Sequence, residues 1–348
     1  MKKLTKPATR TDGPLVSVLI PARNEEQLIE ACLNSLLNQN YLNYEILVLD
    51  DNSSDGTMAI LKRMASEHSR IRVFKGEPLH ADWYGKPFAL QQLSAHAKGE
   101  ILIFTDADTI HQPTSISWAV SNMDELKADF VSGYIGQDVR TFGEKMTVPL
   151  MYLLTGFIVP LFLNRLSKAS VFSTAVGQYI AVKSDVFKKN GGYEAVKKKT
   201  SEDIYLARYI KSLGYKTMFL DISNQVCCRM YSGYTNAVHG IGKNIFDFFN
   251  KNSLVLFIAV IAVFLFLLCP FPLLFYFLIT GNPYTIPLII VNILYTLDWL
   301  MLFIDRKITW YYALLWPLLF INLLYMAGWS WFRTVSGKGF VWKERVVT

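Results

Sequence analysis

The amino-acid sequence predicts an α/β domain followed by hydrophobic, membrane-embedded helices. Short apolar runs alternate with helix-period stretches through the first half of the chain, polar and acidic residues follow three of these runs, and residues 254–331 are almost uninterrupted hydrocarbon. Only 18% of the 348 residues are charged, whereas ordinary soluble domains contain about 25%. We therefore expect one globular domain of roughly 230–250 residues and a separate membrane region.

The predicted sheet begins with four apolar runs of strand length, at residues 15–20, 45–49, 71–74 and 100–104. The three stretches between them carry apolar residues at helical spacing, at residues 24–38, 55–69 and 86–98. Such strand–helix–strand repeats are typical of a parallel sheet with crossover helices. Near-continuous apolar strands indicate that both faces of this sheet are buried.

The predicted membrane region contains three long apolar segments, at residues 253–279, 285–304 and 310–331. Each is long enough to cross about 30 Å of hydrocarbon, and Pro270 and Pro272 predict a kink in the first. Residues 147–164 are also apolar but contain two prolines, so we expect an interfacial or re-entrant segment there. Residues 234–250 mix charged and apolar side chains, which indicates an amphipathic helix on the membrane surface.

These segments give the predicted domain organisation. A polar tail at residues 1–14 precedes the globular domain at 15–250, and the membrane region at 253–331 precedes a basic tail at 332–348. The first 14 residues lack the apolar core of a signal peptide, so we expect the globular domain to lie in the cytosol. Three full spans would place the basic tail outside, against the positive-inside rule, so we expect one segment to be re-entrant.

The net charge of +7 favours a membrane surface over nucleic acid. Basic residues gather beside the apolar segments, where anionic headgroups would attract them. The four cysteines, Cys32, Cys227, Cys228 and Cys269, lack metal-ligand spacing, so we expect reduced thiols.

Polar motifs follow three of the predicted strands: PARNEE at residues 21–26, DDNSSDGT at 50–57 and TDAD at 105–108. Ligands of open α/β sheets bind outside the carboxyl ends of the strands. Helix capping would account for Asn24 and Asp55. It does not account for Asp106 and Asp108, because two adjacent carboxylates repel each other unless a cation or a proton relieves them. Oxygen ligands of this kind suit a divalent cation, so we predict a metal site here.

Two further motifs could carry chemistry. Gly85 and Lys86 precede a predicted helix, and a cation at a helix start indicates that an anion binds nearby, although a plain surface lysine would fit as well. Ser201, Glu202 and Asp203 offer a carboxylate to act as a base, although a capped helix N-terminus would also use these residue types.

Together, these ordered motifs resemble the inverting family 2 glycosyltransferases, over about residues 14–250. The resemblance implies the GT-A nucleotide-sugar-binding fold, a Rossmann-like mixed α/β sheet, here with C-terminal transmembrane helices. It also implies that Asp106 and Asp108 hold Mg²⁺ or Mn²⁺. The implied nucleotide-sugar-binding residues are Pro21, Ala22, Arg23, Glu25, Asp50, Asp51, Lys86, Asp106 and Arg229.

On the acceptor side, residues 177–180 and 190–193 resemble the family's acceptor strand and turn. By the same resemblance Asp203 is the catalytic base and Glu202 binds or orients the acceptor. Arg229 would offset the charge of the leaving diphosphate, for which a planar guanidinium is suited.

A narrower resemblance concerns the acceptor. Residues 225–231 depart from the Gln-X-X-Arg-Trp motif of processive polysaccharide synthases and look like non-processive members that glycosylate lipids. Residues 82–86 and 341–345 resemble carotenoid glucosyltransferases of the diaponeurosporenoate or hydroxychlorobactene type, with Glu344 in place of a glycine.

The predicted function is therefore transfer of a hexose from a UDP-sugar to a hydrophobic lipid or carotenoid acceptor. We expect a multi-pass protein of the cell membrane with a cytoplasmic catalytic domain and no nucleic-acid partner. Two alternatives remain open at this point: a processive polysaccharide synthase, and a non-catalytic membrane-anchored protein that binds nucleotide sugars.

Overall fold

The computed structural model describes residues 10–158, 161–199, 201–249, 251–342 and 345–347. The chain divides into two compact units. The first unit contains Met1–Asp138 and Thr155–Arg229, and the second contains Val139–Leu154 and Met230–Thr348. This division differs from the expected boundary between the globular domain and the membrane region, at residues 250–253. Residues 139–154 and 230–249 belong to the unit that contains the C-terminal helices.

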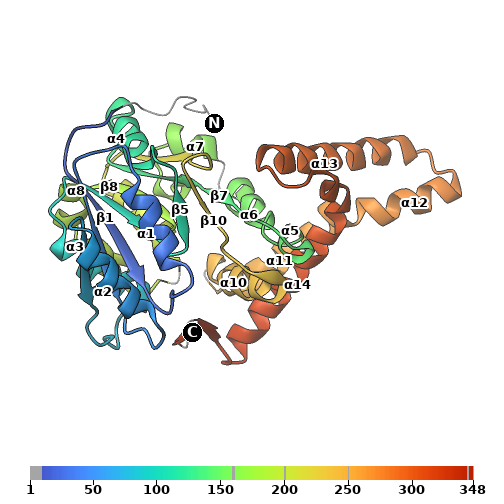
Figure 1. Cartoon of the computed structure of the whole chain (residues 1–348). Helices are drawn as coiled ribbons and strands as arrows, with labels where there is room; N and C mark the ends of the chain where they lie inside the picture. Colours follow the sequence, from blue (N-terminus) through green and yellow to red (C-terminus); the bar gives the residue numbers. More distant parts are fainter. Residues whose placement is uncertain (1–9, 159–160, 200, 250, 343–344, 348) are drawn as a thin grey trace. The chain divides into compact units, whose positions relative to one another are not determined.

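The first unit is built on a seven-stranded sheet with the order β3-β2-β1-β4-β8-β6-β9 (Figure 1). The neighbours β3, β2, β1 and β4 run parallel, as the alternating pattern predicts, whereas β8 runs antiparallel to both β4 and β6. The sheet is thus mixed. The strands are β1 (Val16–Ala22), β2 (Tyr44–Asp50), β3 (Ile71–Lys75), β4 (Ile101–Thr105), β6 (Phe130–Tyr134), β8 (Tyr179–Lys183) and β9 (Thr217–Asp221).

A second, three-stranded sheet lies at the end of the first and has the order β5-β10-β7. Its strands are β5 (Thr109–His111), β7 (Gly136–Gln137) and β10 (Val226–Cys228). Because β5 follows β4 after a three-residue turn, this small sheet holds the segment that carries Asp106 and Asp108.

The helices of the first unit surround the central sheet. They are α1 (Ile29–Leu37), α2 (Thr57–Glu67), α3 (Gly85–His96), α4 (Ser115–Glu125), α7 (Leu161–Leu166), α8 (Ser184–Lys189) and α9 (Glu202–Ser212), with short 3-10 helices η1 (Ser170–Phe172) and η2 (Gly192–Val196). The boundary between the two units falls inside α6 (Leu150–Ile158). The segment at 147–164, which we expected to be interfacial or re-entrant, contains two short helices, α6 and α7. Residues 159–160 between them lie outside the described residues.

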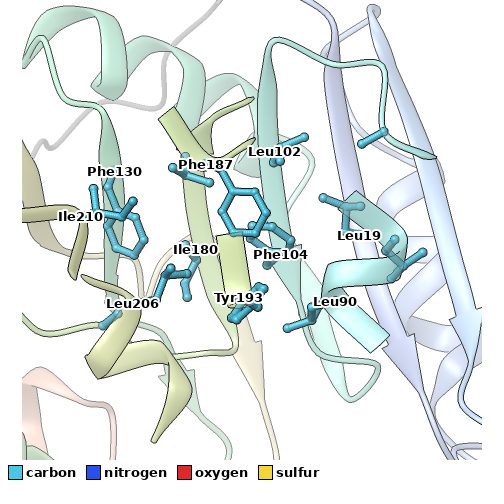
Figure 2. Close-up of a cluster of buried hydrophobic side chains, with 14 of the residues drawn as sticks. Leu19, Leu90, Leu102, Phe104, Phe130, Ile180, Phe187, Tyr193, Leu206 and Ile210 are labelled. Atoms are coloured by element: carbon cyan, nitrogen blue, oxygen red, sulfur yellow. The ribbon is translucent and has the colours of Figure 1, made fainter. Parts of the chain in front are cut away.

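The main core cluster packs α3, α8 and α9 on one face of the sheet (Figure 2). Leu19, Leu102, Phe104 and Ile180 point into it from successive strands, as the period of two along a strand requires. The alternate strand residues, such as Val18 and Ile103, are also buried. Both faces of the sheet are therefore covered, which explains the near-continuous apolar runs in the sequence.

The second unit consists mostly of helices, several of which are apolar. They are α5 (Phe142–Lys145), α10 (Gly233–Phe248), α11 (Ser253–Ala262), the π-helix η3 (Val263–Leu268), α12 (Pro270–Thr280), α13 (Thr285–Asp305), the 3-10 helix η4 (Trp310–Leu315) and α14 (Trp316–Val335). Two short strands, β11 (Phe340–Trp342) and β12 (Arg345–Val347), form a hairpin. Residues 343 and 344 of the expected C-terminal motif lie outside the described residues.

The apolar face of α10 packs on α14. A Cβ added at Gly242 would lie 2.9 Å from the Trp329 ring, and the Phe246 amide donates to the Ser330 hydroxyl over 3.1 Å. Glycine permits this close approach of helix to helix. The helix expected at 234–250 is therefore present, and its apolar side packs against α14 of the same unit. Its location on a membrane surface stays a prediction.

Among the described residues, two helices are long and apolar enough to cross a membrane: Thr285–Asp305 and Trp310–Val335. The bent pair Gly233–Phe248 with Ser253–Leu268 would make a third if it formed one span. The first expected segment, 253–279, is divided at Cys269, where the chain passes from π-helix to α12. Pro270 explains this break, because it has no N–H to donate to the carbonyl of Phe266.

Candidate active site

Three strand ends meet at one edge of the central sheet, as the sequence predicts. Ala22 pairs with Asp50 between β1 and β2, and Leu19 pairs with Phe104 between β1 and β4. The polar motifs that follow these strands are therefore neighbours in space. Such an edge is where open α/β sheets bind ligands.

The first two motifs hold each other through hydrogen bonds. The Arg23 guanidinium donates to the carbonyl of Asp51 over 2.6 Å, and the Ser54 amide donates to the Asn24 side chain over 2.8 Å. Asn24 has a positive φ of 52°, and α1 begins only at Ile29. Asn24 is therefore not the helix cap that its residue type suggested, but a bridge between two loops.

The side chains proposed for the nucleotide lie along these loops. Ala22, Asp50 and Asp51 are buried, and the Asp51 amide donates to the Ala22 carbonyl. One oxygen of Asp50 accepts from the Ser53 amide, whereas its Oδ1 is buried without a partner in the described part of the chain. The pair of loops is thus a rigid edge with acidic groups, while nucleotide contacts of Pro21, Arg23 and Glu25 stay predictions.

A charged cluster gathers residues from three distant parts of the sequence. Lys86 Nζ, from the first turn of α3, lies 2.5 Å from Asp106 Oδ1 after β4. The same ammonium lies 3.8 Å from Glu202 Oε1 at the start of α9. The structure therefore brings together the lysine, the Asp-X-Asp turn and the Glu-Asp pair. The family resemblance predicted that these motifs form one site.

Asp203 is held by backbone amides of two segments. Its Oδ2 accepts from the Gly177 amide over 2.7 Å, and its Oδ1 accepts from the Ile204 amide over 2.8 Å. A Cβ at Gly177 would lie 3.2 Å from Lys86 Nζ, so glycine leaves room for the charged groups here. The side chain of Ser201 makes no capping hydrogen bond to α9, so the expected serine cap is absent; Thr200 lies outside the described residues.

Burial and like charges raise the pKa values of the carboxyl groups in this cluster. Burial, together with the neighbouring charge of Asp106, raises the pKa of Asp108 to about 7. Burial also raises the pKa of Glu202 to about 7, although Lys86 opposes it. Burial raises the pKa of Asp203 in the same way. A carboxyl with a raised pKa is a better proton acceptor near neutral pH than an ordinary aspartate.

The pKa of Lys86 is also raised, but for a different reason. Burial alone lowers the pKa of its ammonium group, but Asp106, Glu202 and Asp203 outweigh burial and raise it above its usual range. Lys86 therefore stays protonated. An ammonium fixed at this edge is suited to bind an anionic diphosphate.

The Asp106–Asp108 turn has a vacant acceptor that suits a metal ion. Asp108 Oδ1 is buried without a hydrogen-bond partner in the described part of the chain, whereas Asp106 is paired with Lys86. No group of three or more His, Cys, Asp or Glu side chains with metal-ligand geometry occurs among the described residues. A cation at Asp108 would thus take further ligands from elsewhere, as oxygen atoms of a bound diphosphate would provide.

The position of Arg229 follows from the register of the small sheet. β10 runs antiparallel to β5 and pairs Cys228 with Thr109. Continuing this register by one residue would bring Arg229 next to Asp108. A role of Arg229 near the donor diphosphate stays a prediction.

The acceptor-side motifs surround the antiparallel strand β8. Gly177 and Gln178 precede this strand, and Gly191 and Gly192 have positive φ values of 79° and 59° in the turn after α8. A Cβ on Gly192 would lie 2.6 Å from the Phe187 ring. Glycine is thus required there by backbone conformation and by close packing.

Sequence reasoning missed a buried polar group beneath the Asp-X-Asp turn. Thr105, Thr109 and His111 are buried and hydrogen bond to one another. Thr105 ends the apolar strand β4, and Thr109 and His111 alternate along β5 as in an ordinary half-buried strand, so the sequence offered no signal beyond an unusual histidine.

Comparison with known proteins shows the family of this chain. The family model described as "Glycosyl transferase family 2" matches residues 17–191, half of the chain. A probable glycosyltransferase of Bacillus subtilis (strain 168) is 29% identical over 211 residues, which cover 59% of this chain and 49% of the relative. A beta-monoglucosyldiacylglycerol synthase of Trichormus variabilis is 39% identical over 97 residues, which cover 27% of this chain and 20% of the relative.

A solved structure supports the fold. A mannosyltransferase from Pyrobaculum calidifontis, in complex with GDP-Man and Mn²⁺, superposes with a TM-score of 0.57 at 21% identity, covering 96% of this chain and 92% of that chain. The chain spans about half the length, or less, of the curated relatives named above. On the family match and the shared architecture, this chain belongs to glycosyltransferase family 2 and has the GT-A fold.

Proposed function

We propose that this glycosyltransferase moves a hexose from a UDP-sugar to a hydrophobic lipid or carotenoid acceptor, with inversion and without processive elongation. The observation that carries the proposal is the convergence of Lys86 with Asp106, Glu202 and Asp203 at the edge where three strand ends meet. This arrangement places a cation that suits a diphosphate in contact with carboxylates that could hold a metal ion or accept a proton.

On the donor side, Lys86 and Arg229 would bind the diphosphate and offset the charge that develops on it as the bond to the sugar breaks. Asp108, with Asp106, would hold Mg²⁺ or Mn²⁺, and the vacant buried oxygen of Asp108 supports this assignment. The bound metal would stabilise negative charge on the leaving diphosphate. The loops at Pro21, Ala22 and Asp51 would bind the uridine.

On the acceptor side, Asp203 would take the proton from an acceptor hydroxyl as it attacks the anomeric carbon. Its raised pKa and its two backbone hydrogen bonds, to Gly177 and Ile204, support a base that is oriented before the acceptor arrives. Glu202 would orient the acceptor. Attack from the face opposite the diphosphate inverts the configuration of the sugar.

The hydrophobic acceptor is supported by the second unit. Two of its helices could cross a membrane, and one relative is named for acting on a diacylglycerol lipid. The departure of residues 225–231 from the processive motif favours a single transfer. The likeness of residues 82–86 to carotenoid glucosyltransferases makes a carotenoid, including a carotenoid carboxylic acid, the first acceptor to test. We place the catalytic unit at the cytosolic face of a multi-pass membrane protein.

The experiment uses the full chain in lipid nanodiscs supplied with UDP-glucose, other UDP-sugars or GDP-mannose, with diacylglycerol and carotenoid acceptors. We expect UDP release and a singly glycosylated lipid in the mass spectrum, both abolished by EDTA. Asp108→Ala is the inactive control, and Asp185→Asn, which changes an exposed surface pair, is the matched active control. A ladder of polymer would favour a processive synthase. Nucleotide binding without any transfer would favour the non-catalytic alternative.

A further inference from the structure

A compact group of buried polar side chains lies beneath the Asp106–Asp108 turn. Thr105, Thr109 and His111, which we call the hydroxyl clamp, are at most 4% exposed. The two threonine hydroxyl oxygens lie 2.9 Å apart, and each lies 3.1 Å from His111 Nε2. Buried polar groups that satisfy one another in this way make a rigid network.

The clamp bonds to two carbonyls of different loops. The Thr109 hydroxyl donates to the Asp106 carbonyl over 2.7 Å, within the turn that carries Asp106 and Asp108. The Thr105 hydroxyl donates to the Gln178 carbonyl over 2.9 Å. Gln178 follows Gly177, whose amide binds Asp203. One small group of side chains therefore contacts both the donor-side turn and the acceptor-side loop.

His111 has polar partners at both ring nitrogens. Nε2 lies 3.1 Å from each threonine hydroxyl, and each hydroxyl has one hydrogen to share among its carbonyl, the other hydroxyl and the ring. Nδ1 lies 3.1 Å from the Ser115 hydroxyl, which donates to the Gln39 side-chain oxygen over 3.0 Å. The Ile116 amide donates to the same Gln39 oxygen, so these contacts fix the position of the ring. Burial lowers the pKa of His111 to about 3, so the ring is neutral.

We propose that His111 is a positioning residue, which through Thr105 and Thr109 couples the metal-binding turn to the loop that orients the catalytic base. This inference rests on the proposed function for the roles of Asp108 and Asp203. The clamp itself joins residue 105 to residue 178, and its two carbonyls belong to segments that carry opposite sides of the reaction.

An ordinary buried hydroxyl on α3 shows the contrast. Ser94 is 4% exposed and donates to the Gln91 carbonyl three residues earlier, within its own helix. The Thr105 hydroxyl of the clamp instead donates to a carbonyl of a distant loop, that of Gln178. Ser94→Ala is therefore a matched control: it removes one buried hydroxyl outside the clamp.

The test uses the full chain in detergent and measures Mn²⁺ binding in the presence of UDP by the EPR signal of free Mn²⁺. Thr109→Val keeps the side-chain shape but removes the donor to Asp106, so Mn²⁺ binding should weaken roughly fivefold. Thr109→Ser keeps the hydroxyl and should bind within about twofold of the unmutated chain. Equal Mn²⁺ binding by the Val and Ser variants would overturn the role of the clamp at the metal turn.

Hydrogen exchange tests the coupling without any ligand. His111→Phe keeps a ring but removes the N–H, so the amides of residues 105–109 and 176–179 should both exchange faster. His111→Gln, whose side-chain amide can donate to both threonines, should restore part of the protection, and Ser94→Ala should leave both segments unchanged. Faster exchange in neither segment would overturn the proposal. If these shifts occur in a chain that transfers no sugar, the proposed function fails while the clamp stands.

Discussion

The ammonium of Lys86 shares its edge of the sheet with the carboxylates of Asp106, Asp108, Glu202 and Asp203. One positive and four negative charges leave a net charge of −3 if all are ionised. Such an excess in a buried place is unfavourable unless protons or cations relieve it. This excess of negative charge supports the proposal that the site binds a divalent cation.

Asp203 should carry the catalytic proton. Asp203→Asn keeps the size of the side chain but cannot accept a proton at neutral pH, so kcat should fall by roughly 10²–10⁴ with a hydroxyl acceptor. Because the donor contacts lie elsewhere, UDP affinity should change little. Glu202→Gln should act mainly on acceptor KM. Steady-state kinetics and UDP titration on the full chain measure both.

The size of this loss depends on the acceptor. A carboxylic acid is already ionised at pH 7, so Asp203→Asn should then cost little activity. With a hydroxyl acceptor, a variant that binds UDP normally and loses less than about threefold in kcat would remove Asp203 as the base.

Asp108 should make the stability of the chain depend on pH. Its pKa is raised from an ordinary 3.8 to about 7 in the folded state. Between these values the folded chain binds more protons than the unfolded chain, so stability should fall as the pH rises from about 4 to about 7. Glu202, raised from 4.5 to about 7, acts in the same direction.

Mn²⁺ should reverse this loss, because it competes with protons for ionised Asp108. The rise in Tm on adding MnCl₂ and UDP should be larger at about pH 8 than at about pH 5.5. Asp108→Asn should remove the Mn²⁺ effect and leave the metal-free Tm at about pH 8 equal or higher, since it removes a buried charge. Thermal unfolding of the detergent-solubilised chain measures this; equal Mn²⁺ shifts at both pH values would contradict it.

At the scale of elements, the second unit depends on hydrogen bonds that repair interrupted helices. Pro270 has no N–H for the carbonyl of Phe266, and the Tyr295 hydroxyl of α13 donates to that carbonyl over 2.6 Å. Asn292 of α13 also donates to the Pro270 carbonyl at the start of α12, over 3.0 Å. A side chain of one helix thus satisfies the backbone of the next, as proline in a membrane helix requires.

Tyr295→Phe removes this repair and should lower the stability of the chain by about 1 kcal/mol. Tyr276→Phe is the matched control, because Tyr276 is 60% exposed on α12. Pro270→Ala restores a backbone donor, so Tyr295→Phe should cost less in that background. Thermal unfolding in detergent measures the four variants. An equal loss from Tyr295→Phe in both backgrounds would show that the hydroxyl does not replace the missing donor.

At the scale of the whole molecule, the second unit should be needed for acceptor transfer. Truncation after Asn250 removes α14, the partner of α10, and exposes Ile241, Ile245 and Phe246, which are now buried. The remaining chain should still bind UDP, require detergent and lose transfer to a lipid acceptor. A truncation after Ser336 keeps α14 whole and is the control for UDP binding and solubility. Undiminished lipid transfer by the chain that ends at Asn250 would show that the helices serve only as an anchor.

The sequence alone predicted the elements that depend on local pattern. The parallel strands β1 to β4 and their crossover helices follow from apolar periodicity, and the acidic motifs follow strand ends that a parallel sheet must bring together. The resemblance to family 2 then predicted the mixed sheet and the residues of the site. The family and the fold are confirmed by comparison, whereas the roles of individual residues stay predictions.

Only the tertiary structure decided what depends on contacts between distant segments. It placed the antiparallel strand β8 between β4 and β6, paired Lys86 with Asp106, and joined Thr105 to Gln178 through the hydroxyl clamp. It also packed residues 139–154 with the C-terminal helices rather than with the first unit. Periodicity reports which face of a segment is buried, but not which segment covers it, because that choice depends on packing and hydrogen bonding between residues far apart in the chain.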